Sequence, residues 1–519
     1  MDADEASLLD KPVLCAIGAR SVQEFLFHAN GLEETVGAEV ILQAVSNGCV
    51  RFAVGHVDPP LAPEECILSW EGAGDEVSFR TDERIKVQVL DSAASNIVLF
   101  FRTGRLCRDV VRKMARYYLD NAYSLPFLSV CVEWTGNMSA DLPALFRRLD
   151  ESKGRSPGAH PTEPFSVVRV ERNTGEPVAF VDPKTGEGLS RVSMLRRRAF
   201  AASRGGQWDG RLVRMLRRAD GKGFYAVAHV DGNNIGALIV ELSGGSCVGS
   251  DPLRNRQVIS LNIRRITRHA VAAATADVKS AFGFADAQME HEVRVVQTGG
   301  DDLNIAASPE VAFPFVERYL AHLSDIPLWE DAQHKVFMSG CAGIAIVEEC
   351  ADYVKAFAYA EECCSRAKDT AKNEINLVNG RAGNWLDYCI VYPDRPEDSE
   401  ADRDMAYVTS DGTGLMLRPY CIDPAFRESP HGYGSFRRRV DALVEMDMKP
   451  ATVATLKLVC GMDIVEAQLY CKGLAVNGSP VVDRLGEPIV RDHDRNYAAW
   501  YDALELYDFM RKTNWRAAR

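Results

Sequence analysis

The sequence Gly299-Gly300-Asp301-Asp302 lies between two apolar runs, Val293–Val296 and Leu303–Ala307. Two glycines and two aspartates between strand-like segments predict a β-hairpin whose tip carries two carboxylates. Glycine adopts positive φ and has no Cβ, so such a tip can turn tightly beside a bulky ligand. Neighbouring strand residues point to opposite faces, so the turn must break this alternation to bring both carboxylates together. Paired carboxylates are typical of a divalent-cation site, most simply for Mg²⁺, although similar turns often bind nothing.

A second acidic turn lies about 70 residues upstream of this tetrad. The apolar run Phe224–Val230 is followed by Asp231-Gly232-Asn233-Asn234-Ile235-Gly236, which indicates a buried strand, a small-residue turn and the start of a helix. An aspartate at the end of one strand can lie beside the hairpin tip of its neighbour. We therefore expect Asp231, Asp301 and Asp302 to converge, and a cation would relieve their mutual repulsion. The alternative is that Asp231 only caps the following helix.

Composition and charge place the chain among ordinary globular proteins. It has 519 residues, 46% of them hydrophobic and 26% charged, enough for about two to four domains. We expect neither a membrane span, which needs ~18 apolar residues, nor a signal peptide, because Met1–Lys11 is acidic and polar. The net charge of −13 argues against a basic sleeve for nucleic acid. Three arginine-rich stretches, 191–198, 211–218 and 437–439, are more typical of solvated helix faces than of binding patches.

The 14 cysteines are scattered and include no Cys-x-x-Cys pair, so no zinc ribbon is expected. Without a secretory signal, we expect reduced thiols, most of them small core residues, and a cytoplasmic location.

The order of apolar and helical patterns predicts an α+β chain with an internal duplication. In the second half we expect strands, helices and a hairpin at 224–231, 253–281, 292–307, 309–324, 335–347, 352–372 and 385–392. The first half offers a similar order, with elements at 13–18, 21–30 and onward, a strand-rich stretch to 102, 106–119 and 127–133. Between the halves, the polar and turn-rich residues 137–220 indicate a linker or insertion. The C-terminal part is predicted helical, at 435–444, 451–460, 464–472 and 497–512.

The proposed duplication differs between its copies at the hairpin tip. Asn96-Ile97-Val98-Leu99 echoes Asn304-Ile305-Ala306-Ala307, and each run precedes a helix. In this alignment Ala93-Ala94-Ser95 takes the position of Asp301-Asp302-Leu303. The first copy is therefore predicted to carry no carboxylates at its tip.

Three ordered motifs resemble the CRISPR polymerase palm, the GGDD domain of the large subunit of type III CRISPR effector complexes. They are the Asp231–Gly236 turn, the Gly299–Asp302 tetrad, and Ser339–Ile346 followed by Ala360-Glu361-Glu362 and Ala367-Lys368. Diguanylate and adenylate cyclase palms are relatives of this family. The resemblance extends to Ser21–Phe27 with Gly31–Glu39, which is similar to the opening of the family's first palm, and to Arg418-Pro419-Tyr420 before a helical tail.

The resemblance implies two ferredoxin-like palm domains with a linker insertion and a small helical C-terminal domain. The expected divisions are 1–136 for a first palm without the acidic tetrad, 137–220 for the linker, 221–395 for the second palm and 396–519 for the helical domain. It further implies that ATP binds between the palms. ATP molecules would be condensed into cyclic oligoadenylates, or into cyclic dinucleotides in minimal relatives, as second messengers of antiviral defence.

If this interpretation holds, specific residues take specific roles. Asp231, Asp301 and Asp302 would be catalytic and, with the Gly232 carbonyl, would hold two Mg²⁺ or Mn²⁺ ions. Backbone N–H groups at a helix start suit a triphosphate. The nucleotide-binding set is predicted to be Gly232, Asn233, Asn234, Ile235, Gly236, Gly299, Gly300, Ser339 and Lys368. His229, two residues before Asp231, is expected to be a satisfied core or rim histidine.

Two alternatives to a cyclic-nucleotide synthase stay open. The palm is a catalytically silent scaffold that binds nucleotide or a CRISPR-type RNA–protein complex, or the chain is a nucleic-acid polymerase or primase. Asn233 and Asn234, where the family often has an aspartate, favour the scaffold slightly. The acidic chain disfavours the polymerase. The expected partners are nucleoside triphosphates, a CRISPR-type complex or a downstream cyclic-nucleotide effector, and a second copy of the chain, but no membrane.

Overall fold

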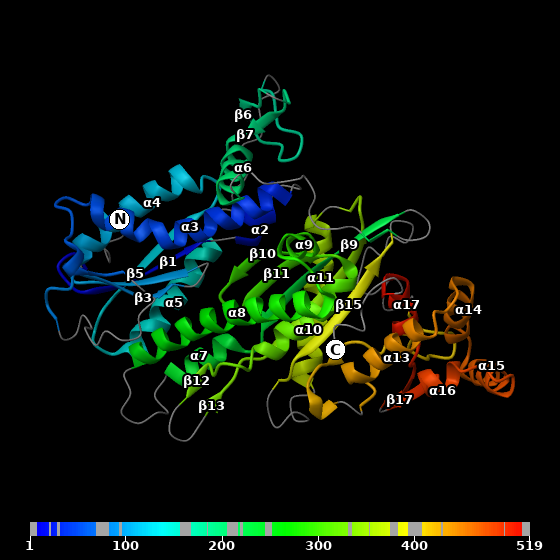
Figure 1. Ribbon diagram of the computed structural model, residues 1–519. Helices are drawn as coiled ribbons and strands as arrows, with labels where there is room; N and C mark the ends of the chain where they lie inside the picture. The colour runs from blue at the N-terminus through cyan, green and yellow to red at the C-terminus, as the bar shows by residue number, and fades with distance from the viewer. Residues whose placement is uncertain are drawn as a thin grey trace.

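The computed structural model places two β-sheets one after the other along the chain, followed by a helical region (Figure 1). The residues it describes are 8–19, 22–27, 32–68, 82–92, 96–155, 168–183, 185–204, 216–217, 222–243, 252–330, 335–351, 353–373, 382–392, 407–426, 429–492 and 494–510. Within these ranges every helix is too short or too polar to span a lipid bilayer.

The first sheet is 5-stranded and has the order β2-β3-β4-β1-β5. Its strands are β1 (Val13–Ala19), β2 (Cys66–Ile67), β3 (Val87–Ser92), β4 (Asn96–Phe101) and β5 (Phe127–Glu133). Its helices are α2 (Val22–Phe27), α3 (Leu32–His56), α4 (Gly104–Asn121) and α5 (Met138–Arg155). The predicted hairpin tip at Ala93–Ser95 lies outside the described residues.

Both faces of the first sheet are covered. Val13 and Ile17 of β1 share a core cluster with residues of α3 and α4. The alternate residues, such as Leu14, share a second cluster with Leu145 and Leu149 of α5. Since successive strand residues point to opposite faces, β1 is apolar throughout. Helix α5 therefore packs on the first sheet, whereas the predicted division at residue 136 assigns it to the linker.

The second sheet is 7-stranded, with the order β10-β11-β9-β14-β15-β16 and with β8 beside β9. Its strands are β8 (Leu216–Arg217), β9 (Gly223–Gly232), β10 (Val293–Gly299), β11 (Asp302–Ala307), β14 (Gly340–Glu348), β15 (Trp385–Val391) and β16 (Tyr420–Cys421). Its helices are α7 (Ile235–Ser243), α8 (Pro252–Phe282), α9 (Asp286–Glu292), α10 (Pro309–His322) and α11 (Tyr353–Asn373). The strand predicted at 335–347 is interrupted: β13 (Lys335–Val336) pairs with β12 (Trp329–Glu330), and β14 begins only at Gly340.

The two sheets share one topology. In the first, β3-β4-β1-β5 follow one another across the sheet, and in the second, β10-β11-β9-β14 do so. Numbered along the chain, each set has the order second, third, first, fourth, and a helix follows the first and the third strand. This is the β-α-β-β-α-β arrangement of the ferredoxin-like fold. The mixed α+β class is thus confirmed, while the four domain divisions stay predictions.

The region between the sheets contributes a β-hairpin and a helix that rests on the first half. Strands β6 (Val178–Val181) and β7 (Gly188–Ser190) precede α6 (Arg191–Arg204), which packs along α3. Arg196 of α6 is fully buried, and Arg197 forms ion pairs with Glu34 and Glu187. The prediction of a solvated arginine face thus holds for Arg191 and Arg198, which are exposed, and is wrong for Arg196.

Helix α3 also touches the second sheet. It contacts β10, where the buried carboxyl group of Glu39 lies beside the backbone of Thr298, one residue before the glycine pair. Helix α3 of the first half thus contacts the acidic hairpin.

The C-terminal region is helical but not independent of the second sheet. It holds α13 (Tyr433–Glu445), α14 (Pro450–Cys460), α15 (Ile464–Val476), α16 (Val481–Leu485), α17 (Tyr501–Met510) and the hairpin β17 (Ile489–Asp492)–β18 (Arg495–Ala498). The helix predicted at 497–512 begins at Tyr501, because the preceding residues complete that hairpin. Residues of α13, α14 and α17 belong to the same core cluster as β9 and β11.

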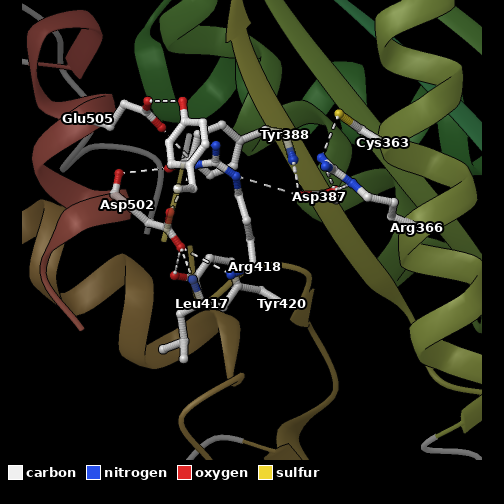
Figure 2. Close-up of polar contacts among 10 residues, drawn as sticks. Cys363, Arg366, Asp387, Tyr388, Leu417, Arg418, Tyr420, Asp502 and Glu505 are labelled. Atoms are coloured by element: carbon white, nitrogen blue, oxygen red, sulfur yellow. Dashed lines mark hydrogen bonds and ion pairs between the residues drawn. The ribbon is translucent and has the colours of Figure 1, made fainter. Parts of the chain in front are cut away.

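A buried polar network joins α17 to the sheet (Figure 2). Nη1 of Arg418 donates to Asp502 Oδ1 at 2.9 Å and to Glu505 Oε2 at 2.7 Å. The guanidinium also lies 3.8 Å from Asp387 of β15, whose other oxygen pairs with Arg366 of α11 at 2.6 Å. Charged side chains are buried at such cost only when they are paired, and here each carboxylate has a cationic partner.

Candidate functional site

The acidic tetrad forms the predicted hairpin tip. Gly299 and Asp302 face each other as the last pair of β10 and β11, and Gly300 and Asp301 make the turn between them. The φ of Gly300 is +64°, a value that glycine adopts without strain. Thr267 of α8 donates a hydrogen bond to the Gly300 carbonyl at 2.9 Å and so ties the tip to that helix.

The hairpin lies directly against the strand that carries the third carboxylate. Leu303 of β11 pairs with Val230 of β9, so Asp231 comes level with the hairpin tip. Ligand atoms of Asp231, Asp302 and His229 all lie within 4.8 Å of one another. The structure therefore brings Asp231 and the tetrad together, as the sequence predicts.

Burial and mutual repulsion perturb these carboxyl groups. Burial, followed by the charge of Asp231, raises the pKa of Asp301 to about 6. Burial and the charges of Asp231 and Asp301 raise the pKa of Asp302 to about 8. A carboxyl group whose pKa rises this far lacks enough positive charge around it. The cluster is thus electrostatically suited to a bound cation.

Lys368 of α11 supplies one positive charge. Its ammonium group pairs with Oδ2 of Asp231. Burial lowers the pKa of Lys368, but the contact with Asp231 outweighs it, so that the pKa is raised overall. The side chain predicted to hold terminal phosphates thus lies at the carboxylate cluster.

Gly232 leaves the room that Asp301 occupies. A Cβ added at Gly232 would lie 2.9 Å from the Cβ and from Oδ2 of Asp301, and 2.7 Å from Cγ1 of Ile235. Any side chain at position 232 would therefore push Asp301 away from Asp231.

A pocket of about 360 Å³ opens beside the carboxylates. Such a volume lies within the range of small-molecule sites. The pocket is lined by Asp231, Gly232, Asn233, Asn234, Ile235, Gly236, Asp301, Lys368, Ala371, Lys372 and Ala382. Most of the predicted nucleotide-binding residues thus share one cavity. Gly299, Gly300 and Ser339 are not among its lining residues and shape its surroundings instead.

Hydrogen bonds of Asn233 and Ser339 connect the turn after β9 to the backbone just before β15. The Asn233 side chain donates to Ser339 Oγ at 3.1 Å and to the Gly383 carbonyl at 2.9 Å. The Asn233 backbone N–H donates to the Ser339 carbonyl at 2.9 Å, and Ser339 Oγ donates to the Ala382 carbonyl at 2.7 Å. The prediction that the Asn233 N–H group binds phosphate is therefore wrong, because that group is already used. The Ser339 hydroxyl likewise braces the loop instead of facing the pocket.

The start of α7 is the part of the turn that is suited to bind a ligand. Asn234 has a φ of +54° and precedes the helix, and its carbonyl accepts the first intrahelical bond from Leu238. The first N–H groups of an α-helix have no partner within the helix. Those of Ile235 and Gly236 therefore stand at the pocket wall, where the helix dipole favours an anion.

His229 is the satisfied rim histidine that the sequence predicts. It is buried, its Nδ1 lies 2.6 Å from Asn304 Oδ1, and burial lowers its pKa. Its ring also meets the Phe357 ring edge to face. It supports the floor of the site as a neutral side chain.

Two residues at the site escaped the sequence reasoning. Thr267 lies in the middle of a long helix, and nothing in its neighbourhood distinguishes it from a solvent-facing threonine. Lys372 lines the pocket one turn after Lys368. The spacing of four residues on a predicted helix was the available signal for this second lysine.

The residues present fit a divalent cation. Carboxylate oxygens are the donors that Mg²⁺ prefers. Asp301 and Asp302 are half-buried, and the positive charge of Lys368 offsets only part of the rise in their pKa. A divalent ion would compensate the charge that one lysine does not.

No protein-family model matches the sequence, and no curated protein matches it. Csm1 from T. onnurineus has a similar structure, with a TM-score of 0.51 and 12% sequence identity over 97% of this chain and 70% of that chain. Csm1–Csm4 cassettes in complex with cA4 and with one ATP match at a TM-score of 0.45 each, with 12% identity and the same coverage. Csm1 is a component of type III CRISPR complexes. The chain therefore has the fold of Csm1, in agreement with the resemblance read from its motifs.

Proposed function

We propose that the chain is a nucleotidyltransferase that condenses ATP, or another nucleoside triphosphate, into a cyclic oligonucleotide or cyclic dinucleotide with release of pyrophosphate. The observation that supports this best is the convergence of Asp231, Asp301 and Asp302 beside a pocket of about 360 Å³ that also holds a lysine and a helix start. In this proposal the product is a second messenger of antiviral defence, made in the cytoplasm of a prokaryote.

Asp231, Asp301 and Asp302, with the Gly232 carbonyl, would hold two Mg²⁺ or Mn²⁺ ions. Bound there, such ions lower the pKa of a ribose hydroxyl and neutralise charge on the leaving oxygen. The carboxylates must be deprotonated to bind them, so the raised pKa of Asp302 makes metal loading favour higher pH.

The remaining residues bind and orient the triphosphate. Ile235 and Gly236 line the pocket, and their N–H groups, which have no partner within the helix, would receive phosphate oxygens. Lys368, released from Asp231 when a metal takes over that carboxylate, would pair with a phosphate of the same nucleotide. No protein base is required, which agrees with a His229 that is neutral and hydrogen-bonded.

The first sheet would bind the second nucleotide without metals. Its topology matches that of the second sheet, and the sequence puts Ala93-Ala94-Ser95 at the position of the acidic pair. One chain would thus provide both halves of a nucleotide pair, and a second copy of the chain is not needed for the chemistry.

The experiment is to incubate the purified chain with each nucleoside triphosphate and Mg²⁺ or Mn²⁺ and to identify products by mass spectrometry. Asp301→Ala should lower product formation at least ~100-fold. The variant lacks a carboxylate that would hold the metal ions, and these ions would compensate charge in the transition state. Asp286→Ala is the matched control, since this aspartate is exposed at the start of α9 and pairs only with Lys279 among described residues. A folded Asp301→Ala protein with unchanged product formation would contradict the assignment.

A second candidate is a silent scaffold subunit of a CRISPR-type RNA–protein complex. The ion pair between Lys368 and Asp231 favours it, because a lysine already compensates one carboxylate. The two proposals separate in a binding experiment with Mn²⁺ followed by electron paramagnetic resonance. An active site binds Mn²⁺ at Asp301 and loses it in Asp301→Ala, whereas a scaffold binds none there.

A further inference from the structure

A cluster of histidine and aspartate side chains lies where α8 meets the end of α10, away from the carboxylate site. His269 and Asp277 come from α8, His322 is the last residue of α10, and Asp325 follows in the next turn. The two helices run side by side in Figure 1 and pack against each other. The cluster is therefore fixed by two packed helices rather than by a loose surface loop.

Two imidazole nitrogens converge on one carboxylate oxygen. His269 Nε2 lies 2.9 Å and His322 Nδ1 lies 2.7 Å from Oδ2 of Asp325. The two rings are nearly perpendicular, with centroids 6.1 Å apart. Two imidazoles that bind one ion at ~2.0–2.1 Å place their centroids roughly 5–5.5 Å apart. The two rings are thus spaced somewhat wider than in such a site, and Asp325, which both nitrogens contact, would move back to admit an ion.

The second nitrogen of His322 already has the partner that metal-binding histidines use. Its Nε2 lies 3.0 Å from Oδ2 of Asp277, and the same carboxylate oxygen pairs with Arg318 at 3.2 Å. A carboxylate that accepts the distal N–H of a histidine fixes the tautomer and leaves the other nitrogen free to bind a metal. A surface ion pair between one histidine and one aspartate does not require this second carboxylate.

We propose that His269, His322 and Asp325 form a site for a divalent transition-metal ion, Zn²⁺ in the cell, with Asp277 as the positioning residue. Two imidazoles and one carboxylate with a position left open are a ligand set typical of Zn²⁺. Asp325 also lines a pocket of about 550 Å³ together with Asn262, Arg265 and Trp329. The ion would therefore stand at the rim of a cavity and could bind a further ligand there.

The test is titration of the chelator-treated full-length chain with Co²⁺, whose visible absorption reports coordination, and with Zn²⁺ in competition with a chromophoric chelator. We expect one equivalent to bind at this site. His322→Gln and His269→Gln should each weaken binding at least ~10-fold, and Asp277→Asn should weaken it ~10–100-fold. His56→Gln, in an exposed histidine of α3, is the matched control and should bind like the wild type.

Two other groups in the described residues could take up the probe and are tested in parallel. They are Cys15 and Cys131 of the first sheet with Cys107 of α4, and the carboxylate site with His229. If the bound equivalent disappears in Cys107→Ser or Asp301→Ala and persists in the double variant His269→Gln/His322→Gln, the proposal is wrong. His269 has a 42% exposed side chain, so His269→Gln should fold even if His322→Gln does not.

Discussion

At the scale of single residues, Gly232 matters for the atoms that it lacks. Asp301 lies against the backbone of β9 at Gly232, the residue after Asp231. This close approach is possible only because position 232 has no side chain. The same residue lines the pocket beside Asp231. The geometry of the acidic cluster thus depends on a residue that carries no functional group.

Gly232→Ala is expected to displace Asp301 and lower product formation by about 100-fold, the loss typical of a misplacement of about 1 Å. A folded Gly232→Ala protein with full turnover would contradict this account. Gly473→Ala is the matched control, because an added Cβ in helix α15 meets nothing within 4 Å. That variant should keep its activity and gain up to ~1 kcal/mol of stability from helix propensity.

The raised pKa values predict how stability depends on pH in the metal-free chain. The pKa of Asp301 lies at about 6 and that of Asp302 at about 8, both above the ordinary value of 3.8. Between about pH 4 and 8 these two groups therefore bind more protons in the folded chain than in the unfolded chain, so their contribution to stability falls as pH rises. The thermal midpoint in a chelator should decrease from pH 5.5 to 8.5, and Mg²⁺ should restore more of it at the higher pH. Asp302→Asn should flatten the dependence, and an unchanged slope in that variant would overturn the explanation.

The sequence alone predicts the site's carboxylates but not its internal hydrogen bonds. Asp231, Asp301 and Asp302 stand out because strand ends and a glycine turn leave few other places for them. Asn233 and Ser339 were assigned to the ligand, yet both are used within the protein. Their partners, Ala382 and Gly383, are more than 40 positions along the chain, and no local pattern reveals such contacts.

At the scale of elements, the hairpin β10–β11 is braced by the helix behind it. Thr267 Oγ1 contacts the carbonyls of both Ile263, in its own helix α8, and Gly300, at the tip. The first of these contacts is common for threonine in helices, and the second is specific to this place. Helix α8 thus fixes the position of the hairpin tip that carries Asp301 and Asp302.

Thr267→Val should keep the side-chain shape but leave the Gly300 carbonyl without its donor. We expect a loss of ~1–3 kcal/mol in stability and roughly 10-fold in product formation, measured by thermal unfolding and by turnover. Thr455→Val is the control, because Thr455 makes the same contact to the carbonyl four residues earlier in an exposed helix. Equal effects of the two substitutions would show that the tip does not depend on Thr267.

Element types were predictable where the apolar period was unbroken. The strand at β9 and the helices α8, α10 and α11 lie within a few residues of their expected positions. The sequence predicts one strand at 335–347, but Lys335–Val336 pairs with Trp329–Glu330 instead of continuing into β14. The partner that a short strand chooses is decided by tertiary contacts and not by its own sequence.

At the scale of the whole molecule, the C-terminal helices share one core with the second sheet. Phe509 of α17 meets Phe224 of β9 edge to face at 5.2 Å, and Arg418 donates hydrogen bonds to Asp502 and Glu505 of the same helix. The sequence predicts the helices but not this union, because the carboxylates Asp387, Asp502 and Glu505 look like ordinary surface residues in one dimension. We therefore expect the second sheet and the C-terminal helices to unfold together.

Arg418→Met should leave Asp502 and Glu505 buried without a cation and lower stability by ~3–5 kcal/mol. Circular dichroism and tryptophan fluorescence should report one common transition at a reduced denaturant concentration. Arg484→Met removes an exposed ion pair with Glu445 in the same region and should cost less than ~1 kcal/mol. If Arg418→Met melts the C-terminal helices while the second sheet stays folded, the two are separate folding units.

Helix α3 gives the acidic hairpin a mechanical connection to the other half of the chain. Buried Glu39 of α3 lies beside the backbone of Thr298, and the next residues along the strand are the tetrad itself. A rotation of the first half by a few degrees would move α3 against β10 and so change the spacing of the carboxylates. A partner that binds only the first sheet would in this way change the rate of the proposed nucleotidyl transfer without contacting the pocket.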